Sequence, residues 1–491
     1  MRSLRTLPAL TLVVAAAWPL VAASPAAAGT ASVHDGTQGR GSEPVRSVVY
    51  IAAPGEQNHV TARLNGTQAT LTDTFGITPG NGCGRPTADP TTVTCDLGPT
   101  GTATDIDAPK PAANAFTFLL GDGDDTAAIT GSPTTSANLD GGPGNDVLDA
   151  GSGTGADPDD PGVPAGALIT GGPGNDTLTG GPGEDLFDER GATSTGSDTI
   201  RGLRGADTVT YARRTKSVRV TLAGGRDDGS AGERDQLEGI ESAVGGSAAD
   251  TLVGAATDDV LVGGGGADRL AGRTGDDTLF AGSDDPAPPA SGGARTADRL
   301  SGGPGQDTLV GSAGANRIDG GTGGDTVDAL GGADHILARD RSPDRLECGL
   351  GTDTVRADGR DFTDRACNRV RRRGGARAVP LPFPALSAVG DPHTVAAVDF
   401  GLGCPGDLRG GCRVAVRLAS GKTLIGTGRY RLRAGRIADS ASLRLTRAGR
   451  RLLTRPRPRA IQATLRVTTG LGGDSTRGIT IRVVIPPGDA S

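Results

Sequence analysis

Large aromatic side chains are almost missing from this sequence, since Phe, Trp and Tyr make up 2% of its 491 residues. An ordinary globular core needs such side chains, so most of the chain is not expected to form one. Bases of nucleic acids stack on aromatic rings, so nucleic-acid binding is not expected either. Beyond the N-terminus, no apolar run approaches the ~18 residues of a membrane-spanning helix. The sequence therefore predicts no nucleic-acid partner and no membrane span.

Histidine is also scarce, with four residues scattered along the chain at His34, His59, His335 and His393. The sequence contains neither His-Glu-x-x-His, the pattern of zinc proteases, nor Gly-x-Ser-x-Gly, the nucleophile turn of many hydrolases. These absences make an enzyme the less favoured interpretation. A secreted, calcium-dependent polysaccharide hydrolase or lyase stays open as the alternative, because aspartates and calcium can act on acidic sugars.

The six cysteines fall into three close pairs, Cys83/Cys95, Cys348/Cys367 and Cys404/Cys412. An even number of cysteines in local pairs predicts three disulfides in an exported protein. Zinc is the competing interpretation. It is disfavoured because no pair has the short spacing of a zinc-binding Cys-x₂₋₄-Cys motif.

The N-terminus predicts export. Arg2 and Arg5 precede an apolar run from Ala9 to Ala23, and Ala26-Ala27-Ala28 provides small residues before Gly29. This is the pattern of a signal peptide at residues 1–28. A membrane anchor is the alternative, but the run is short and prolines interrupt it. We expect a secreted, extracellular protein.

Glycine, by contrast, is abundant at 82 residues, and much of it belongs to a repeat of nine residues. The repeat reads Gly-Gly-x-Gly-x-Asp-x-apolar-x. Six copies contain the complete Gly-Gly-x-Gly-x-Asp: Gly141–Asp146, Gly171–Asp176, Gly180–Asp185, Gly263–Asp268, Gly302–Asp307 and Gly320–Asp325. Such a fixed period is typical of a solenoid. A flexible linker would not place an apolar residue two positions after each aspartate.

The repeat positions predict calcium binding. Glycines permit tight turns with exposed carbonyl oxygens. The aspartates add hard anionic oxygens, and Ca²⁺ prefers six to eight oxygen ligands. Two repeats would form one coil, so turns two repeats apart would stack at about one strand spacing, ~4.8 Å. The expected ligands are Asp125, Asp146, Asp176, Asp185, Asp207, Asp250, Asp259, Asp268, Asp277, Asp298, Asp307, Asp325, Asp334 and Asp353.

Two repeats deserve separate comment. Asn316 replaces the aspartate with a neutral amide, which predicts a weaker site or none. Asp146 is separated from its neighbours by irregular inserts, so its stacking partner stays unassigned from sequence. A solenoid that needs no metal is the alternative interpretation for the whole region.

These nonapeptides resemble those of the RTX, or haemolysin-type, calcium-binding repeat family, over roughly residues 120–356. The resemblance implies a parallel β-roll with several Ca²⁺ ions between its turns and an affinity suited to extracellular calcium. Pore formation is not implied, because no long amphipathic or apolar helix is evident and lysine is nearly absent.

The expected fold is all-β: a parallel β-roll or β-helix solenoid followed by a C-terminal antiparallel β-sandwich. Residues 29–119 form an N-terminal β region that could supply the first solenoid coils. Residues 120–370 form the calcium-binding roll, with Tyr211–Ser242 as an insertion containing one strand, Val218–Leu222. The acidic residues of this insertion are expected to form a solvated loop, and a further ion site is the alternative: Asp227, Asp228, Glu233, Asp235 and Glu238. Residues 371–390 are a basic linker, and residues 391–491 form the sandwich.

Charge is divided unevenly between these regions. Residues 371–491 contain 22 basic and six acidic residues, a net charge of +16, which leaves −25 on residues 29–370. The acidic repeats therefore require cations. The basic C-terminal domain is a candidate for binding cell-surface or matrix polyanions, and a merely solvated sandwich is the alternative. A structural, adhesion or surface-binding role is the favoured function.

Overall fold

The computed structural model describes residues 28–38, 43–97, 113–131, 135–151, 166–189, 191, 196–282 and 296–373. Beyond these it describes residues 379–380, 386–391, 394–398, 402–404, 412–420, 423–433, 436–438, 444–448, 459–469 and 474–483. The predicted signal peptide lies outside the described residues, apart from Ala28. The chain divides into an N-terminal unit, mainly Ser3–Ala255 with Val260–Gly264, and a C-terminal unit, Ala256–Asp259 with Gly265–Ser491.

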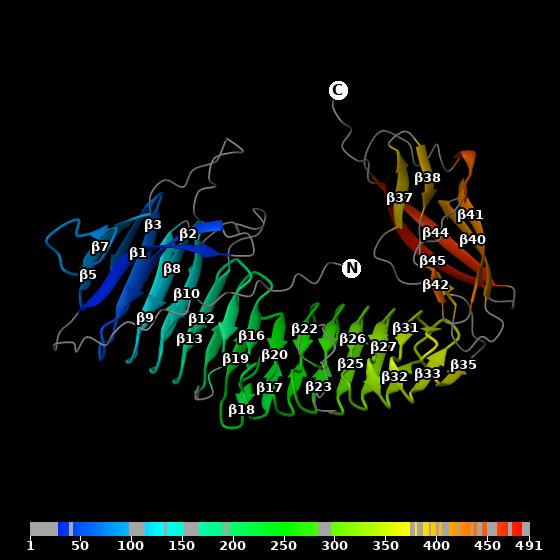
Figure 1. Ribbon diagram of the computed structural model, residues 1–491, viewed down its shortest axis with the longest axis horizontal. Coiled ribbons are helices and arrows are strands. Elements are labelled where there is room, and N and C mark those ends of the chain that lie inside the picture. Colours follow the sequence, from blue (N-terminus) through cyan, green and yellow to red (C-terminus); the bar gives the residue numbers. More distant parts are fainter. Residues whose placement is uncertain are drawn as a thin grey trace. The chain divides into compact units, whose positions relative to one another are not determined.

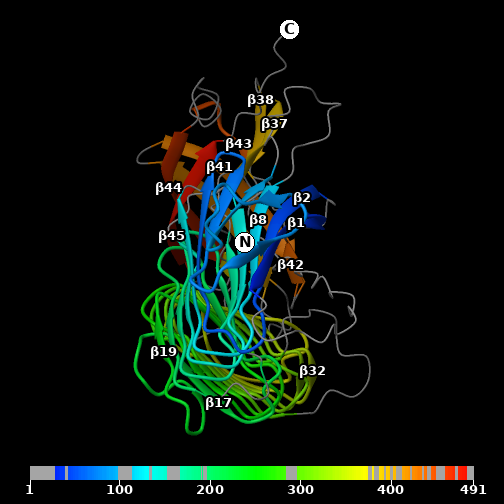
Figure 2. The same cartoon turned by 90° about the vertical axis from the view of Figure 1, so that its left-hand side faces the viewer.

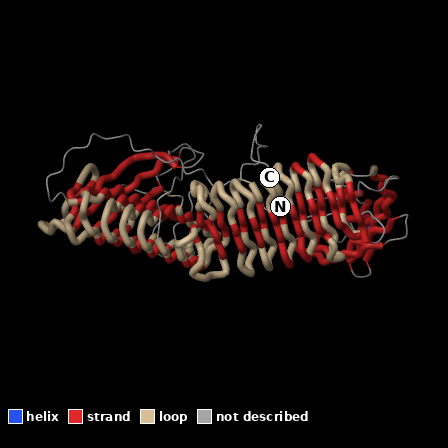
Figure 3. Tube along the Cα trace, turned by 90° about the horizontal axis from the view of Figure 1, so that it is seen from below, coloured by secondary structure: helices blue, strands red, loops and turns tan. Residues whose placement is uncertain are grey.

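All named elements are β-strands (Figure 1). In both units, short strands alternate with turns along a coiled path, and the coils stack side by side (Figure 3). The predicted all-β class and the parallel roll are therefore confirmed. Among the described residues, none forms a helix long and apolar enough to cross a membrane.

The N-terminal unit contains three sheets. Sheet I contains, in spatial order, β5 (Ile77–Pro79), β1 (Gly29–Gln38), β2 (Glu43–Ile51), β8 (Ala113–Leu119), β10 (Thr135–Asp140), β12 (Ala167–Thr170), β14 (Leu186–Asp188), β16 (Thr208–Thr210), β20 (Ser242–Val244) and β22 (Val260–Val262). Sheet II contains β6 (Cys83–Gly84), β7 (Thr92–Asp96), β4 (Gln68–Thr72), β3 (His59–Asn65), β9 (Thr126–Gly131), β11 (Val147–Asp149), β13 (Thr177–Thr179), β15 (Thr199–Arg201) and β19 (Gln236–Glu238). Sheet III contains β18 (Gly229–Ser230), β17 (Val218–Thr221) and β21 (Thr251–Val253).

The N-terminal β region joins the solenoid directly. Strand β2 lies between antiparallel β1 and parallel β8 (Figure 2), and β3 pairs in parallel with β9. Its two strands thus continue sheets I and II. Strand β17 lies within the predicted strand of the insertion, and its parallel pairing with β21 begins sheet III.

The C-terminal unit contains two sheets of the roll. Sheet IV contains β24 (Thr278–Phe280), β26 (Thr308–Val310), β28 (Thr326–Asp328), β31 (Arg345–Glu347) and β34 (Phe362–Thr363). Sheet V contains β23 (Arg269–Ala271), β25 (Arg299–Pro304), β27 (Arg317–Thr322), β30 (His335–Ala338), β33 (Thr354–Asp358) and β35 (Arg369–Arg373). Strands β29 (Gly331–Gly332) and β32 (Leu350–Gly351) pair in a turn. Successive nonapeptides alternate between sheets IV and V, so two repeats form one coil.

Farther along the chain, strands pair mainly antiparallel. The larger sheet contains β38 (Thr394–Val398), β37 (Leu386–Asp391), β45 (Asp474–Val483), β44 (Arg459–Thr469), β40 (Cys412–Ser420), β41 (Thr423–Leu432) and β43 (Arg444–Leu445). The smaller sheet contains β36 (Val379–Pro380), β39 (Leu402–Cys404) and β42 (Arg436–Ala438). Only β37 and β45 pair in parallel among the described pairs of these strands.

The roll has a thin core. Each short strand places the eighth residue of its repeat inward, and the inward residues stack in register from coil to coil. Leu309, for example, pairs with Leu279 on one side and Val327 on the other. The following eighth-position residues are all buried: Leu148, Leu178, Phe187, Leu252, Leu261, Leu270, Leu279, Leu309, Ile318, Val327 and Ile336. Because this core is about one side chain wide, the turns must contribute to stability.

Candidate metal sites in the stacked turns

The sixth-position aspartates form ladders along the stacked turns. In each ladder, the carboxylate Oδ1 of one aspartate accepts a hydrogen bond from the backbone N–H of the equivalent residue one coil earlier. At sheet IV, the N–H groups of Asp259, Asp277 and Asp307 donate to Asp277, Asp307 and Asp325 at 3.0, 2.9 and 3.1 Å. The predicted stacking of Asp307 on Asp325 is therefore present.

Every predicted ligand belongs to such a ladder or begins one, and all fourteen are buried. Along sheet II the ladder contains Asp125, Asp146 and Asp176, and along sheet I it contains Asp185 and Asp207. Asp250 accepts the N–H of Val218 at sheet III. The sheet IV ladder contains Asp259, Asp277, Asp307 and Asp325, and the sheet V ladder contains Asp268, Asp298, Asp334 and Asp353.

Inserted loops do not interrupt the ladders. Asp146 donates its N–H to Asp176 at 2.8 Å, although residues 152–165 separate their coils. The N–H of Asp125 donates to Asp146 in turn, so Asp146 has stacked partners on both sides. Asp268 likewise donates to Asp298 at 2.9 Å across the insert at 283–295. The stacking partners of Asp146, unassigned from sequence, are thus Asp125 and Asp176.

The second carboxylate oxygen of many ladder aspartates is buried and has no hydrogen-bond partner among the described residues. A buried anionic oxygen without a partner is costly unless a cation neutralises it. Ladder aspartates with this orphaned Oδ2 are Asp125, Asp146, Asp176, Asp207, Asp277, Asp307, Asp325, Asp334, Asp344 and Asp353.

Carbonyl oxygens of the neighbouring turn converge on these orphaned atoms. A Cβ added to Gly302 would meet Asp307 Oδ2 and would lie 2.5 Å from the carbonyl oxygen of Gly320 in the next coil. At Gly141 the added Cβ would meet Asp146 Oδ2 and lie 2.8 Å from the Gly171 carbonyl oxygen. At Gly302 and Gly141 a side chain would therefore fill the space where carboxylate and carbonyl oxygens meet. This donor set fits a hard cation such as Ca²⁺.

Burial disfavours the ionised form of these carboxylates unless a cation lies beside them. Desolvation, with a further contribution from neighbouring Asp198 and Asp146, raises the pKa of Asp176 to about 8. Desolvation also raises the pKa of Asp146 and Asp325 to about 7. The backbone N–H that each Oδ1 accepts lowers the pKa but does not offset burial.

Two amides and one guanidinium group donate hydrogen bonds to oxygens inside the turns. Asn316 accepts the N–H of Asp298, and its Nδ2 donates to the carbonyl oxygens of Ser312 and Gly314 at 3.0 and 3.1 Å. Asn58 begins the sheet II ladder, and its Nδ2 donates to the Leu120 carbonyl oxygen at 3.2 Å. An amide nitrogen thus satisfies the carbonyl oxygens that would otherwise coordinate an ion.

The third such group is Arg214, which is buried in the insertion. Its Nη1 donates to Glu233 Oε1 at 2.7 Å, and its Nε donates to the Glu189 carbonyl oxygen at 2.7 Å. Its Nη2 lies 3.7 Å from Glu189 Oε2. Burial raises the pKa of the Glu189 carboxyl group well above its usual range. The sequence offers no periodic signal for this arrangement.

The insertion also corrects one interpretation of the sequence. Its acidic residues were expected to form a solvated loop, but Asp228 and Asp235 are buried. Asp235 accepts the N–H of Asp198 at 3.0 Å and so extends the sheet II ladder. Asp227 and Glu238 are exposed, as expected, and pair with Arg219 and Arg201.

Further ladder members were missed because their spacing departs from the repeat. Asp344 follows Asp325 by 19 residues instead of 18, and its N–H donates to Asp361 at 3.4 Å. Asn368 ends the sheet V ladder by accepting the N–H of Asp353 at 2.7 Å. Asp344 lies two positions before the apolar Leu346, as in the repeat, so a search for this pattern without a fixed period would find it. Asp361 lies directly before Phe362 and would not be found in this way.

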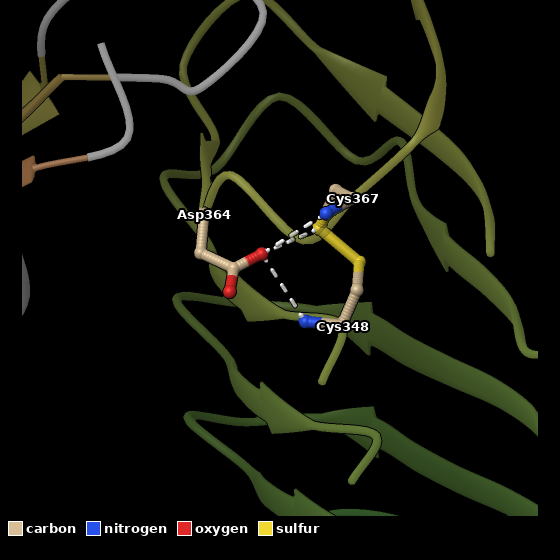
Figure 4. A group of neighbouring side chains, drawn as sticks. All are labelled: Cys348, Asp364 and Cys367. Carbon is tan, nitrogen blue, oxygen red and sulfur yellow. Dashed lines mark hydrogen bonds between the residues drawn. A yellow bond between two sulfur atoms is a disulfide. The ribbon is translucent and has the colours of Figure 1, made fainter. Parts of the chain in front are cut away.

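The cysteines near the end of the roll do not form a metal site. Cys348 and Cys367 form a disulfide with an S–S distance of 2.03 Å (Figure 4), so neither provides a thiolate. Asp364 Oδ1 accepts the N–H groups of both cysteines at 3.4 and 3.2 Å. Cys83 and Cys95 form a second disulfide, which confirms two predicted pairs. Cys412 is also disulfide-bonded, but the side chain of Cys404 lies outside the described residues.

The family model of the RTX calcium-binding nonapeptide repeat matches residues 138–155, 168–188, 186–211, 244–279, 262–285 and 293–337. The roll thus contains RTX calcium-binding nonapeptide repeats between residues 138 and 337. The matched segments include the fully repeated turns from Asp146 to Asp325, so the family match and the orphaned oxygens point to the same turns. No curated protein matches the chain.

Proposed function

We propose that this chain is a secreted calcium-binding protein in which Ca²⁺ ions between stacked turns complete the fold of the RTX roll. The observation that carries the proposal is the row of buried, orphaned Oδ2 atoms facing carbonyl oxygens of the next turn. A bound Ca²⁺ would supply the positive charge that these oxygens lack. The fourteen predicted aspartates are its proposed ligands, together with Asp198, Asp235 and Asp344.

Secretion is supported by the N-terminal pattern at residues 1–28 and by the disulfides. Both belong to oxidising compartments. Extracellular calcium is abundant, so sites of ~10⁻⁴–10⁻³ M affinity would be filled there. A roll that folds only after export fits a structural, adhesion or surface-binding role, with the basic C-terminal domain as a candidate contact for polyanions.

The alternative, a polysaccharide hydrolase or lyase, requires accessible carboxylates outside the repeat positions. One acidic pair outside those positions flanks Arg214: Glu189 is buried and Glu233 is half-buried. A polymer cannot reach it without opening the roll. The structural role is therefore favoured.

The test is a calcium titration of the mature protein from Gly29, after chelation, followed by circular dichroism and calorimetry. We expect little β signal without metal at low salt and recovery of the signal at millimolar Ca²⁺, with several ions bound. Mg²⁺ at equal concentration is the control, because its preference for strict octahedral geometry should make it a poor substitute. An unchanged spectrum after exhaustive chelation would rule out the proposal.

A further inference from the structure

In three successive repeats of sheet V, arginine follows the ladder residue: Arg269, Arg299 and Arg317 occupy this seventh position in register with one another. In three successive repeats of sheet IV, threonine occupies the same position: Thr278, Thr308 and Thr326 are also in register. The next strand of sheet IV that follows them, β31, has Arg345 there, and Arg345 forms an ion pair with Glu347. Over these three coils the two outer faces of the roll therefore have different chemistry.

The row continues through β30, β33 and β35. His335 pairs with Arg317, Thr354 with His335, and Arg369 with Thr354. Arg356 and Arg371 form a second, shorter row two residues farther along their strands. We call the arginines of these two rows, all of them exposed, the arginine face: Arg269, Arg299, Arg317, Arg356, Arg369 and Arg371.

The arginine face has few acidic neighbours to neutralise it. Among the described residues, the ion pairs found in the structure involve other arginines. At the matching outward positions of the sheet V strands, Asp319 on β27 is the acidic side chain. Arginines on adjacent strands lie about one strand spacing apart, ~4.8 Å, and repel each other. An array of this kind is stabilised when an anionic chain lies along it.

We propose that the arginine face binds a linear acidic polysaccharide lying across the strands of sheet V. Guanidinium groups bind carboxylate and sulfate groups through paired N–H donors, and the evenly spaced row matches a polymer with regularly repeated anionic groups. Nucleic acid is disfavoured. The outward residues two positions after the row on the first four strands are Ala271, Ser301, Asp319 and Leu337, and none of these four side chains has a ring on which a base could stack. This inference rests on the proposed function, since the row exists only when the calcium-bound roll is folded.

The test measures binding of heparin, hyaluronan, neutral dextran and oligothymidine to the full mature chain in saturating Ca²⁺. The variant R269T/R299T/R317T replaces three arginines with the residue that the roll itself uses at the same position of sheet IV, so its fold should be retained. The control R63T/R204T/R213T removes the same charge from exposed arginines of the N-terminal unit. We expect the first variant to lose about tenfold or more in affinity for an acidic polysaccharide and the control to lose much less.

Each outcome decides the proposal. Binding of heparin or hyaluronan that depends on the arginine face supports it and shows whether sulfate or carboxylate is recognised. Equal losses in both variants, a larger loss in the control, or no binding by the unmodified protein would overturn it. Tighter binding of oligothymidine than of either acidic polysaccharide would also overturn it. Circular dichroism in the same Ca²⁺ reports the roll separately, so a folded protein without binding refutes only this inference.

Discussion

The two ladders of the C-terminal unit share one backbone arrangement but differ in the atoms they bury. At sheet IV, a carboxylate occupies each rung from Asp259 to Asp361. At sheet V, amides occupy two rungs, Asn316 and Asn368. Both residue types accept the N–H of the preceding coil. The second atom of the side chain differs. Asp325 Oδ2 has no hydrogen-bond partner in the described part of the chain, whereas Asn316 Nδ2 donates to two carbonyl oxygens.

This comparison separates stacking from ion binding. The hydrogen bond from the backbone N–H of the preceding coil joins the two coils whether the accepting side chain is charged or neutral. The need for a cation arises only where the second atom is an oxygen, because that oxygen and the nearby carbonyl oxygens repel one another without a positive charge between them. Changing that second atom or its charge should therefore change how strongly a turn depends on a cation.

The largest expected effect comes from pH in the metal-free protein. Desolvation raises the pKa of Asp325 to about 7 and those of Asp277 and Asp307 to about 6, above the ~3.9 of an unfolded aspartate. Raised folded-state pKa values mean that protonation stabilises the fold, fully below about pH 4 and progressively less as pH rises through 6 to 7. We expect chelated protein to gain β signal by circular dichroism between pH 8 and pH 5.

Calcium should reverse this dependence, because protons and Ca²⁺ compete for the same oxygens. The calcium midpoint should therefore rise as pH falls. A chelated protein whose β signal falls on acidification would contradict the account of the carboxylates.

Replacing Asp325 should reveal the role of the second atom. Asp325→Ala removes both the N–H acceptor and the cation ligand, and we expect a loss of about 1–3 kcal/mol in calcium-induced folding. Asp325→Asn should lose less, because its amide can copy Asn316. The measurement is the calcium midpoint by circular dichroism, and equal shifts for both variants would show that the amide gives no compensation. Asp146→Ala should match Asp325→Ala, since both aspartates have stacked partners on each side.

The converse change is Asn316→Asp. It replaces the amide nitrogen that occupies the turn with an oxygen, so we expect one additional Ca²⁺ by calorimetry and lower stability of the metal-free protein. Asn368→Asp at the end of the ladder is the matched control, because it makes the same change of charge. Within the described part of the chain, no further coil stacks on Asn368. An unchanged number of ions in Asn316→Asp would show that the amide does not block a site.

The smallest effect concerns turn geometry rather than charge. Leu330 has a left-handed backbone with φ of 64°, at the position where the preceding repeat along the chain has Gly321 at 101°. Leu330→Gly should stabilise the roll by roughly 1 kcal/mol, because glycine adopts this conformation without steric cost. Leu350→Gly is the control, since Leu350 is also exposed but is not left-handed, and it should be neutral or destabilising. Thermal unfolding in Ca²⁺ measures both variants.

The sequence by itself determined the roll wherever the repeat is regular. The nine-residue period identified the inward residues such as Leu309 and Val327, and it predicted that Asp307 stacks on Asp325. It succeeded because two repeats of constant length make one coil, so residues 18 apart must meet. The local spacing of the cysteines likewise identified Cys83–Cys95 and Cys348–Cys367.

Only the tertiary structure decided which turns stack where coil length varies. Asp198 meets Asp235, 37 residues away, and Asp146 meets Asp176 across an insert. Sheet hydrogen bonds set the register between coils, and a loop that leaves the coil lengthens the chain without changing that register. The nine-residue period therefore no longer identifies the stacking partner of such an aspartate, whereas the strand pairing does. The arginine face was hidden for the same reason, because residues such as Arg269 and Arg299 are neighbours only after the coils are stacked.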